Sequence, residues 1–383
     1  MRRHLLLLLG ALGACAPGPP PGPIPVDALG PAVRFLDSAV AAGAAPGAVL
    51  AVSVRGRHVY HATGRMGIGI DTVPDSTTVY DLASLSKVIG LTTAAMLAVH
   101  EGRLELDAPV TRYVPAFAGP GKERVTIRHL LTHSSGLPAF RLLYRETSDP
   151  CAALALTDTT ALDTLPGRRF VYSDLGAIVL GQAIERVYGE RLDSLIARRV
   201  FAPLGMGSTR YLPPVEWIPR IPPTENDPWR GRIVRGEVHD ENAARLGGVA
   251  GHAGLFGSAR DLLVFGDWLL AVRRGRDGDT LPVTLDRRIV RRFTKRQNLP
   301  RGSSRALGWD TPSRGSSAGR RLSRSSFGHT GFTGTSIWID PRRELVIVLL
   351  SNRVHPTREN GQWGPVRRQV ADRVVEGLRA AGF

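Results

Sequence analysis

Residues 81–90 read Asp-Leu-Ala-Ser-Leu-Ser-Lys-Val-Ile-Gly and place Ser84 three residues before Lys87. The chain has 50 Lys and Arg residues, of which only Lys87, Lys122 and Lys295 are lysine. Residues three apart on a helix share a face, so we expect the Ser84 hydroxyl and the Lys87 amine to be neighbours. Arginine stays protonated in proteins, whereas a buried lysine can change its protonation state. A lysine at this position in an arginine-rich chain therefore predicts an activated serine nucleophile.

Two further short motifs follow the Ser84–Lys87 motif along the chain, and we call the three motifs boxes. Residues 172–174 (Tyr-Ser-Asp) begin an expected helix over 174–188, and residues 329–331 (His-Thr-Gly) precede an expected strand over 335–340. The order Ser-x-x-Lys, Tyr-x-Asn/Asp, Lys/His-Thr-Gly resembles the serine β-lactamase and penicillin-binding-protein superfamily. Within it, the chain is similar to the branch of class C β-lactamases and D-Ala-D-Ala peptidases or esterases. The resemblance runs from about residue 29 to 380 and includes companion stretches at 125–138, 201–206 and 254–262.

The resemblance implies a role for each residue of the boxes. Ser84 would attack a carbonyl carbon and form an acyl-enzyme, while Lys87 and Tyr172 together take its proton and return it to the leaving group. The backbone N–H groups of Ser84 and Phe332 would form the oxyanion hole. The residues expected to line the substrate site are Asp174, His329, Thr330, Gly331 and Phe332.

Two positions depart from the pattern of the family. The third box begins with His329, where β-lactamases mostly have lysine, and histidine is mostly neutral at pH 7. We therefore expect less efficient β-lactam hydrolysis. The second box ends in Asp174 instead of asparagine, and a carboxylate beside Lys87 favours the protonated ammonium. Our hypothesis is that Lys87 stays cationic and that Tyr172 is the base.

Two stretches bear on the substrate. Residues 238–254 and 351–357 are similar to a subgroup of these hydrolases linked to cell-wall recycling and muropeptide amide cleavage. His252, Asn352 and Arg353 are the substrate contacts that this similarity suggests. The alternative is that the glycine-rich run 246–254 is only a tight structural loop. The histidines at 239, 252 and 355 lack the spacing of a zinc motif, and we expect neither metal nor cofactor.

The expected fold is α/β, with an antiparallel sheet built from both chain ends. Strands are predicted over 48–55, 57–63, 335–340 and 344–351, with hairpin links between neighbours. A helix over 28–42 and a final helix with valines at four-residue spacing would flank the sheet. A mostly helical part is inserted between these ends. We assign 29–383 to one catalytic domain, with its sheet part over about 29–83 and 240–383 and its helical part over about 84–239.

The N-terminus resembles the export signal of a bacterial lipoprotein. Arg2 and Arg3 precede an apolar run over 5–12, which is too short to remain as a transmembrane helix. Cys15 ends a lipobox-like stretch, so residues 1–14 are expected to be a signal peptide and Cys15 to be lipidated. Residues 15–28, rich in Pro and Gly, would tether the domain to the membrane. The alternative is a plain signal peptide with an incidental cysteine.

The remaining cysteine and the charge of the chain allow further expectations. Cys151 is expected to be a small buried hydrophobe. A net charge of +16 suggests nucleic acid, but the arginines are scattered and do not alternate with aromatics, which argues against that class of partner. Two explanations of the net charge remain: attraction of the protein to an anionic membrane or cell wall, and a bias in composition without a functional role.

Four functions remain open at this point. The first is an exported, membrane-tethered serine hydrolase that cuts amide bonds in peptidoglycan fragments. The second is a promiscuous esterase, and the third a β-lactamase. The fourth is a penicillin-recognising lipoprotein that is acylated without turnover.

Overall fold

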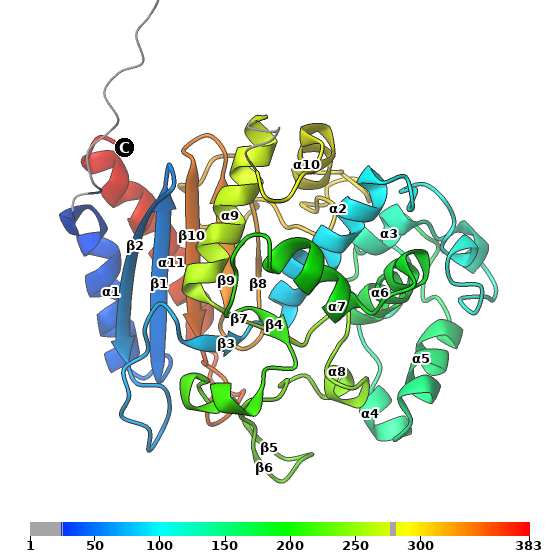
Figure 1. The fold of residues 1–383 in the computed structure, drawn as a ribbon, viewed down its shortest axis with the longest axis horizontal. Helices are drawn as coiled ribbons and strands as arrows, with labels where there is room; N and C mark the ends of the chain where they lie inside the picture. The colour runs from blue at the N-terminus through cyan, green and yellow to red at the C-terminus, as the bar shows by residue number, and fades with distance from the viewer. Residues whose placement is uncertain (1–23, 25, 276–280) are drawn as a thin grey trace, which may run out of the picture.

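The computed structural model describes residues 24, 26–275 and 281–383 (Figure 1). The expected signal peptide, Cys15 and most of the expected tether lie outside the described residues. At the end of the tether, Ile24 is buried, and Val26–Leu29 forms a turn of 3-10 helix that contacts the C-terminal helix α11 (Trp363–Ala380). This end of the tether is therefore part of the folded protein.

The centre of the protein is a five-stranded antiparallel sheet in the order β2-β1-β10-β9-β8. Strands β1 (Gly47–Val54) and β2 (Arg57–Gly64) come from the N-terminal end of the chain, and β1 pairs with β10 along its length. The other strands are β8 (Phe327–Thr330), β9 (Ser336–Asp340) and β10 (Leu345–Ser351). The predicted fold is confirmed, since both ends of the chain build one sheet.

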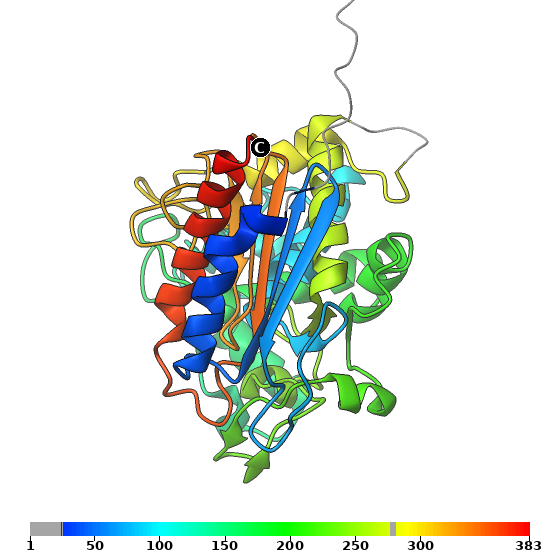
Figure 2. The same ribbon diagram turned by 90° about the vertical axis from the view of Figure 1, so that its left-hand side faces the viewer.

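Helices cover both faces of this sheet, which explains why β1 and β10 are buried throughout. Figure 2 shows α1 (Gly30–Ala41) and α11 side by side on one face. Helix α9 (Ala259–Arg274) packs on the other face and contacts β1 and β10. The two helix layers enclose separate apolar cores on the two sides of the sheet.

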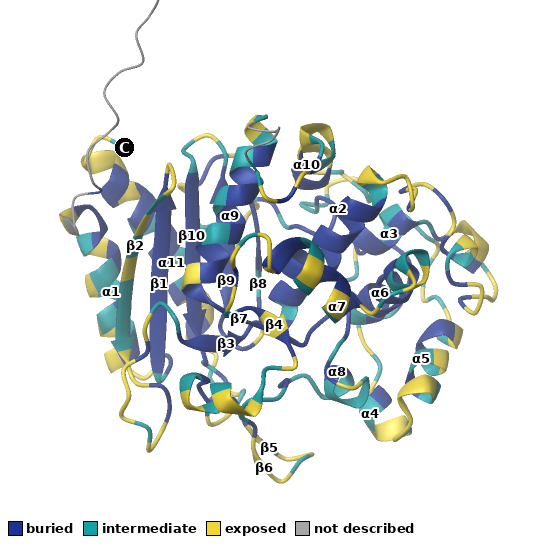
Figure 3. Cartoon of the chain, in the orientation of Figure 1, coloured by how far each residue is buried: buried dark blue, intermediate teal, exposed yellow. Residues whose placement is uncertain are grey.

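The middle of the chain is mostly helical and extends from the α9 side of the sheet (Figure 1). Residues Ala83–His100 form one continuous helical segment, with a 3-10 turn at Ala83–Leu85, a π-helical stretch at Lys87–Thr92 and α2 at Thr93–His100. This segment is long and apolar enough to cross a membrane, but it is mostly buried inside the protein (Figure 3). Its apolar composition is therefore explained by packing in the core.

Short helices and strands surround this core segment. The helices are α3 (Ile127–Leu131), α4 (Leu143–Glu146), α5 (Pro150–Thr159), α6 (Asp174–Tyr188), α7 (Leu192–Ile196), α8 (Glu241–Arg245) and α10 (Arg287–Thr294). Two small sheets are formed by β3 (Val79–Asp81), β7 (Leu255–Ser258) and β4 (Arg210–Tyr211), and by β5 (Asn226–Asp227) and β6 (Arg232–Ile233).

Cys151 is exposed, so the expectation of a buried cysteine is wrong. It is the second residue of α5, where the carboxylate of Asp149 accepts its backbone N–H at 3.0 Å. Helix α5 buries the face that carries Ala153 and Thr157, four residues apart. Residue 151 lies off that face, and its side chain therefore points to solvent.

Candidate active site

The turn before Ser84 is held in an unusual backbone conformation. Ala83 has φ +46°, a left-handed conformation that non-glycine residues rarely adopt. The Asp81 carboxylate accepts the Ala83 N–H at 2.8 Å, and the Thr335 hydroxyl donates to the Leu82 carbonyl oxygen at 3.0 Å. These bonds stabilise the turn, and the helix that follows it presents Ser84 at its first turn.

Lys87 is buried, and acceptors surround its ammonium group. Nζ donates to Ser84 Oγ at 2.9 Å and to the His252 carbonyl oxygen at 2.9 Å, and lies 2.7 Å from Asp174 Oδ1. Two of the three N–H donors of the ammonium are used in these hydrogen bonds, and the Asp174 carboxylate forms an ion pair with the same group. Burial alone would lower the pKa of Lys87, but the charge of Asp174 and the neighbouring Tyr172 raise it above its usual value. This arrangement agrees with our hypothesis that Lys87 is cationic.

Tyr172 lies among two cations and two imidazoles. Its ring centroid is 5.0 Å from Lys87 Nζ and 5.3 Å from the Arg305 guanidinium carbon. The rings of His133 and His329 lie 4.5 Å and 5.9 Å away. The Tyr172 hydroxyl is buried and has no hydrogen-bond partner among the described residues. Its oxygen therefore has free hydrogen-bonding capacity beside the Lys87 ammonium.

Both imidazoles beside Tyr172 are uncharged. Burial, followed by the charge of Arg305, holds the pKa of His133 and of His329 well below the usual value for histidine. His133 Nδ1 accepts the Ser173 N–H at 3.1 Å. His329 Nδ1 donates to the Thr330 carbonyl oxygen at 2.8 Å, which leaves Nε2 as an acceptor without a partner in the described part of the chain. His329 therefore does not replace the ammonium of the family's usual lysine.

A cavity of about 740 Å³ opens above Ser84 and is lined by arginines. Ser84, Tyr172, His329, Thr330, Gly331 and Phe332, all expected from the sequence, line it. It is also lined by Arg353, one of the contacts expected from the sequence, and by Arg305, Arg367 and Arg368, which sequence reasoning missed. Burial, with the repulsion of Arg353, lowers the pKa of Arg367 to about 9, so that this guanidinium is still charged at neutral pH. The cavity is therefore suited to an anionic ligand.

Gly331 lies where the end of β8 meets the turn before the nucleophile. Its N–H donates to the Thr335 carbonyl oxygen at 2.7 Å, and Arg367 donates to its carbonyl oxygen. A Cβ atom at this position would collide with the Leu82 carbonyl oxygen and the Thr335 hydroxyl. Only glycine allows this close approach, which places the following residue, Phe332, at the rim of the cavity.

The structure gives His252 and Asn352 contacts within the protein, and neither lines the cavity. His252 Nε2 donates to Asp240 Oδ1 at 2.8 Å, and its carbonyl oxygen accepts the Lys87 ammonium. The Asn352 amide donates to the carbonyl oxygens of Met66 and Pro223, each at 2.8 Å. Both side chains are buried, so the expectation that they touch substrate finds no support.

The glycine-rich run is a place of close packing. A Cβ at Gly251 would collide with the Ala177 carbonyl oxygen in α6. The alternative interpretation of this run as a tight structural loop therefore fits the structure better. Within the described part of the chain, no group of three or more His, Cys, Asp or Glu side chains is placed to hold a metal ion.

Residues 32–372 match the family model described as Beta-lactamase. The chain belongs to the β-lactamase family. It is 30% identical over 320 residues to a putative D-alanyl-D-alanine carboxypeptidase of Salmonella typhi, which covers 76% of this chain and 73% of that protein. A protein of the same description from Salmonella newport has the same identity and coverage. As a member of this family, the protein is a serine hydrolase.

Solved structures of this family share the fold. A penicillin-binding protein homologue from Caulobacter crescentus superimposes with a TM-score of 0.74 at 19% identity, over 93% of this chain and 99% of that one. A class C β-lactamase gives a TM-score of 0.71 at 19% identity, over 90% and 96%. The hydrolase EstCE1 gives 0.73 at 22% identity, over 91% and 98%. The β-lactamase/transpeptidase-like fold expected from the sequence is thereby confirmed.

Proposed function

We propose that this serine hydrolase is exported and cleaves amide bonds in peptidoglycan-derived muropeptides through an acyl-enzyme on Ser84. The observation that carries the proposal is the contact of Ser84 Oγ with the Lys87 ammonium, at 2.9 Å, at the floor of an arginine-lined cavity. Muropeptide stem peptides carry free carboxylates, which arginines bind well. The description of the Salmonella relatives as putative D-alanyl-D-alanine carboxypeptidases supports the same class of substrate.

In the proposed mechanism Tyr172 is the base and Lys87 is a fixed cation. Lys87 donates to Ser84 Oγ, so the Ser84 proton is free to point toward the unpartnered Tyr172 oxygen. A Tyr172 phenolate, stabilised by the charges of Lys87 and Arg305, takes this proton as Oγ attacks the amide carbon. The backbone N–H groups of Ser84 and Phe332 stabilise the oxyanion.

The same groups complete the turnover. Tyr172 returns the proton to the amine nitrogen as the C–N bond breaks, which leaves the acyl group on Ser84. Water then attacks the acyl carbon and gives a proton to the Tyr172 phenolate. Release of Ser84 requires that this proton return to Oγ, so the enzyme ends in its starting state.

A promiscuous esterase is the second candidate. The neutral His329 at the sheet edge provides no fixed charge where the β-lactamases of the family mostly have lysine. Esters without a carboxylate would then compete well for the same serine. A β-lactamase or a penicillin-recognising protein without turnover would use the same acylation step, and the following experiment separates the non-turnover protein from an amide hydrolase.

The test is intact-protein mass spectrometry after incubation with a fluorophosphonate, a penicillin, or a disaccharide-peptide from peptidoglycan, with Ser84→Ala as control. We expect a fluorophosphonate adduct on wild-type protein only, and cleavage of the disaccharide-peptide at an amide bond. Stable penicillin labelling without cleavage of any substrate would favour the non-turnover protein. The absence of every Ser84 adduct would refute the proposed mechanism.

Export and lipid anchoring are a separate part of the proposal. They rest on the charged start of the chain, the apolar run over 5–12 and the lipobox-like position of Cys15. We expect palmitate labelling and membrane fractionation of the full chain in a bacterial host. The Cys15→Ala variant should lose the label, and a full chain that stays in the cytosolic fraction would contradict the proposal.

A further inference from the structure

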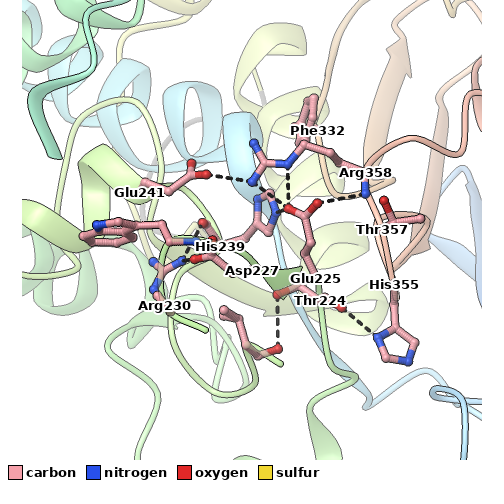
Figure 4. Close-up of polar contacts among 12 residues, drawn as sticks. Thr224, Glu225, Asp227, Arg230, His239, Glu241, Phe332, His355, Thr357 and Arg358 are labelled. Carbon is pink, nitrogen blue, oxygen red and sulfur yellow. Dashed lines mark hydrogen bonds and ion pairs between the residues drawn. The ribbon is translucent and has the colours of Figure 1, made fainter. Parts of the chain in front are cut away.

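A partly buried cluster of charged side chains lies against Phe332 (Figure 4), a residue of the cavity lining. It consists of Glu225, His239, Glu241 and Arg358, and we call it the Glu225 cluster. Glu225 accepts His239 Nε2–H at 2.8 Å and Arg358 Nε–H at 2.6 Å, and Arg358 Nη2 donates to Glu241 at 2.7 Å. Burial opposes ionisation of Glu225, but the bonds from His239 and Arg358 lower its pKa to about 2. The carboxylate is therefore charged and fixes the His239 ring.

His239 reaches the second of the two expected oxyanion-hole donors through its ring. The imidazole stacks on the Phe332 ring, with centroids 5.8 Å apart and planes at 22° (Figure 4). Phe332 is otherwise 48% exposed at the rim of the cavity. Arginines also contact Phe332: Arg353 Nε donates to its carbonyl oxygen at 2.9 Å, and the guanidiniums of Arg353 and Arg358 lie over its ring.

His239 reaches the first donor through its backbone. Its N–H donates to Asp81 Oδ2 at 2.6 Å, while Asp81 Oδ1 accepts the N–H of Ala83, the residue before Ser84. The Asp81 carbonyl oxygen also accepts the hydroxyl of Thr333, the residue after Phe332, at 2.7 Å. His239 thus contacts both Asp81, which accepts an N–H from the turn that carries Ser84, and the ring of Phe332.

We propose that His239, fixed by Glu225, is a positioning residue that sets the separation and direction of the two oxyanion-hole N–H groups. This inference rests on the proposed acyl-enzyme mechanism on Ser84. Loss of one oxyanion-hole donor typically lowers kcat by about 100-fold to 1000-fold. A donor that is displaced but still present should lose less, and we expect about 10-fold to 100-fold when the stacking ring is removed.

The histidines of this region offer a matched control. His355 is buried to the same degree as His239, and both are 4% exposed. Its Nδ1 donates to the Thr224 carbonyl oxygen at 2.7 Å and its Nε2 accepts the Ile68 N–H at 3.1 Å. These partners lie outside the cavity lining. Substitution of His355 therefore perturbs the packing of the region without touching the expected oxyanion hole.

The experiment compares wild-type protein with His239→Gln, His239→Phe, Glu225→Gln and His355→Gln. Each is assayed for the rate of Ser84 labelling by a fluorophosphonate, for kcat and KM on p-nitrophenyl acetate, and for Tm. For His239→Gln we expect kcat and the labelling rate to fall about 10-fold to 100-fold, with KM within about twofold. His239→Phe keeps a ring on Phe332 and should recover most of this loss. Glu225→Gln should show a smaller loss in the same direction.

The outcomes separate this inference from the function on which it rests. Wild-type labelling and turnover retained in His239→Gln would overturn the inference alone. An equal loss in His355→Gln, or a loss that only follows Tm across the variants, would also overturn it, because a general packing effect would then be sufficient. Wild-type protein without a Ser84 adduct would overturn the proposed function and this inference with it.

Discussion

Replacement of Asp174 by asparagine should add a descending limb on the alkaline side of the pH–rate profile. In the native protein Asp174 Oδ1 lies 2.7 Å from Lys87 Nζ, and Lys87 is 3% exposed while Asp174 is 27% exposed. Two unit charges at this distance interact by about 6 kcal/mol at an effective dielectric constant of 20. Solvent reaches Asp174 in part, so we take about half of this value, or about 3 kcal/mol, as the stabilisation of the protonated Lys87.

The direction of the change in the pH–rate profile follows from the loss of a negative charge. Without the carboxylate, burial lowers the pKa of Lys87, and Asp174 no longer opposes it. Loss of the ammonium charge should then produce a descending limb of kcat/KM toward the alkaline end of the pH range, which the native protein lacks. The raised native pKa means that the ion pair stabilises the folded state below the unfolded lysine pKa, about 10.4, as long as the Asp174 carboxylate is ionised. On the alkaline side, this stabilisation is lost as pH rises through the native pKa.

The assay is hydrolysis of p-nitrophenyl acetate from pH 5 to 10.5, together with denaturant unfolding at pH 7. The Asp174→Asn variant should lose about 2 to 3 kcal/mol of unfolding free energy, since the asparagine oxygen still accepts one N–H. Asp158→Asn is the control, because Asp158 is also buried and accepts from Gln182 at 2.8 Å beside the buried Lys122. A variant profile that overlays the native one would refute the coupling of Asp174 to Lys87.

Three further predictions test other parts of the site. Lys87→Arg should lower the rate of fluorophosphonate labelling of Ser84 by at least about 1000-fold, because a planar guanidinium cannot reproduce the contacts of the ammonium with the oxygens of Ser84, His252 and Asp174. A labelling rate within about tenfold of wild type would contradict this. Arg367→Gln should raise KM about tenfold for peptides with a free carboxylate and leave KM for p-nitrophenyl acetate within about twofold of the wild-type value. An equal rise in KM for both substrates would exclude an anion-binding role. Cys151 should react with an aromatic disulfide in the folded protein at nearly the rate of a free thiol, and protection until unfolding would contradict its exposed position.

The sequence was sufficient for the parts of the protein that depend on local pattern. The hairpin at Gly56 and the strand pair over 335–351 have alternating or continuous apolar residues with turn residues between them, and both occur where predicted. The three boxes carry their chemistry in short spacings, so Ser84, Lys87 and Tyr172 could be named together. Their distance from one another in space is set by contacts between distant segments, such as the Lys87 bond to the His252 carbonyl oxygen.

The residues that were missed have no such local signal. The place of His133 beside Tyr172 depends on the packing of the loop after α3 against the start of α6. Arg305 and Arg367 are two arginines in a chain with many, and only the fold brings them to the cavity. Asn352 was misjudged for the opposite reason, because its distinctive stretch suggested a ligand whereas two buried carbonyl oxygens use its amide.

The arginines also explain how a site with a neutral His329 can keep a positive cavity. The usual lysine of the third box places an ammonium at the end of the strand that His329 occupies here. In this protein positive charge comes instead from Arg305, in the loop before β8, and from Arg367 on α11. Arg305 lies against Tyr172, whereas Arg367 donates to the Gly331 carbonyl oxygen behind the expected oxyanion hole. An anionic substrate group drawn to Arg367 would therefore sit on the side of the C-terminal helix, away from Tyr172, and would leave the Tyr172 hydroxyl open to the leaving group.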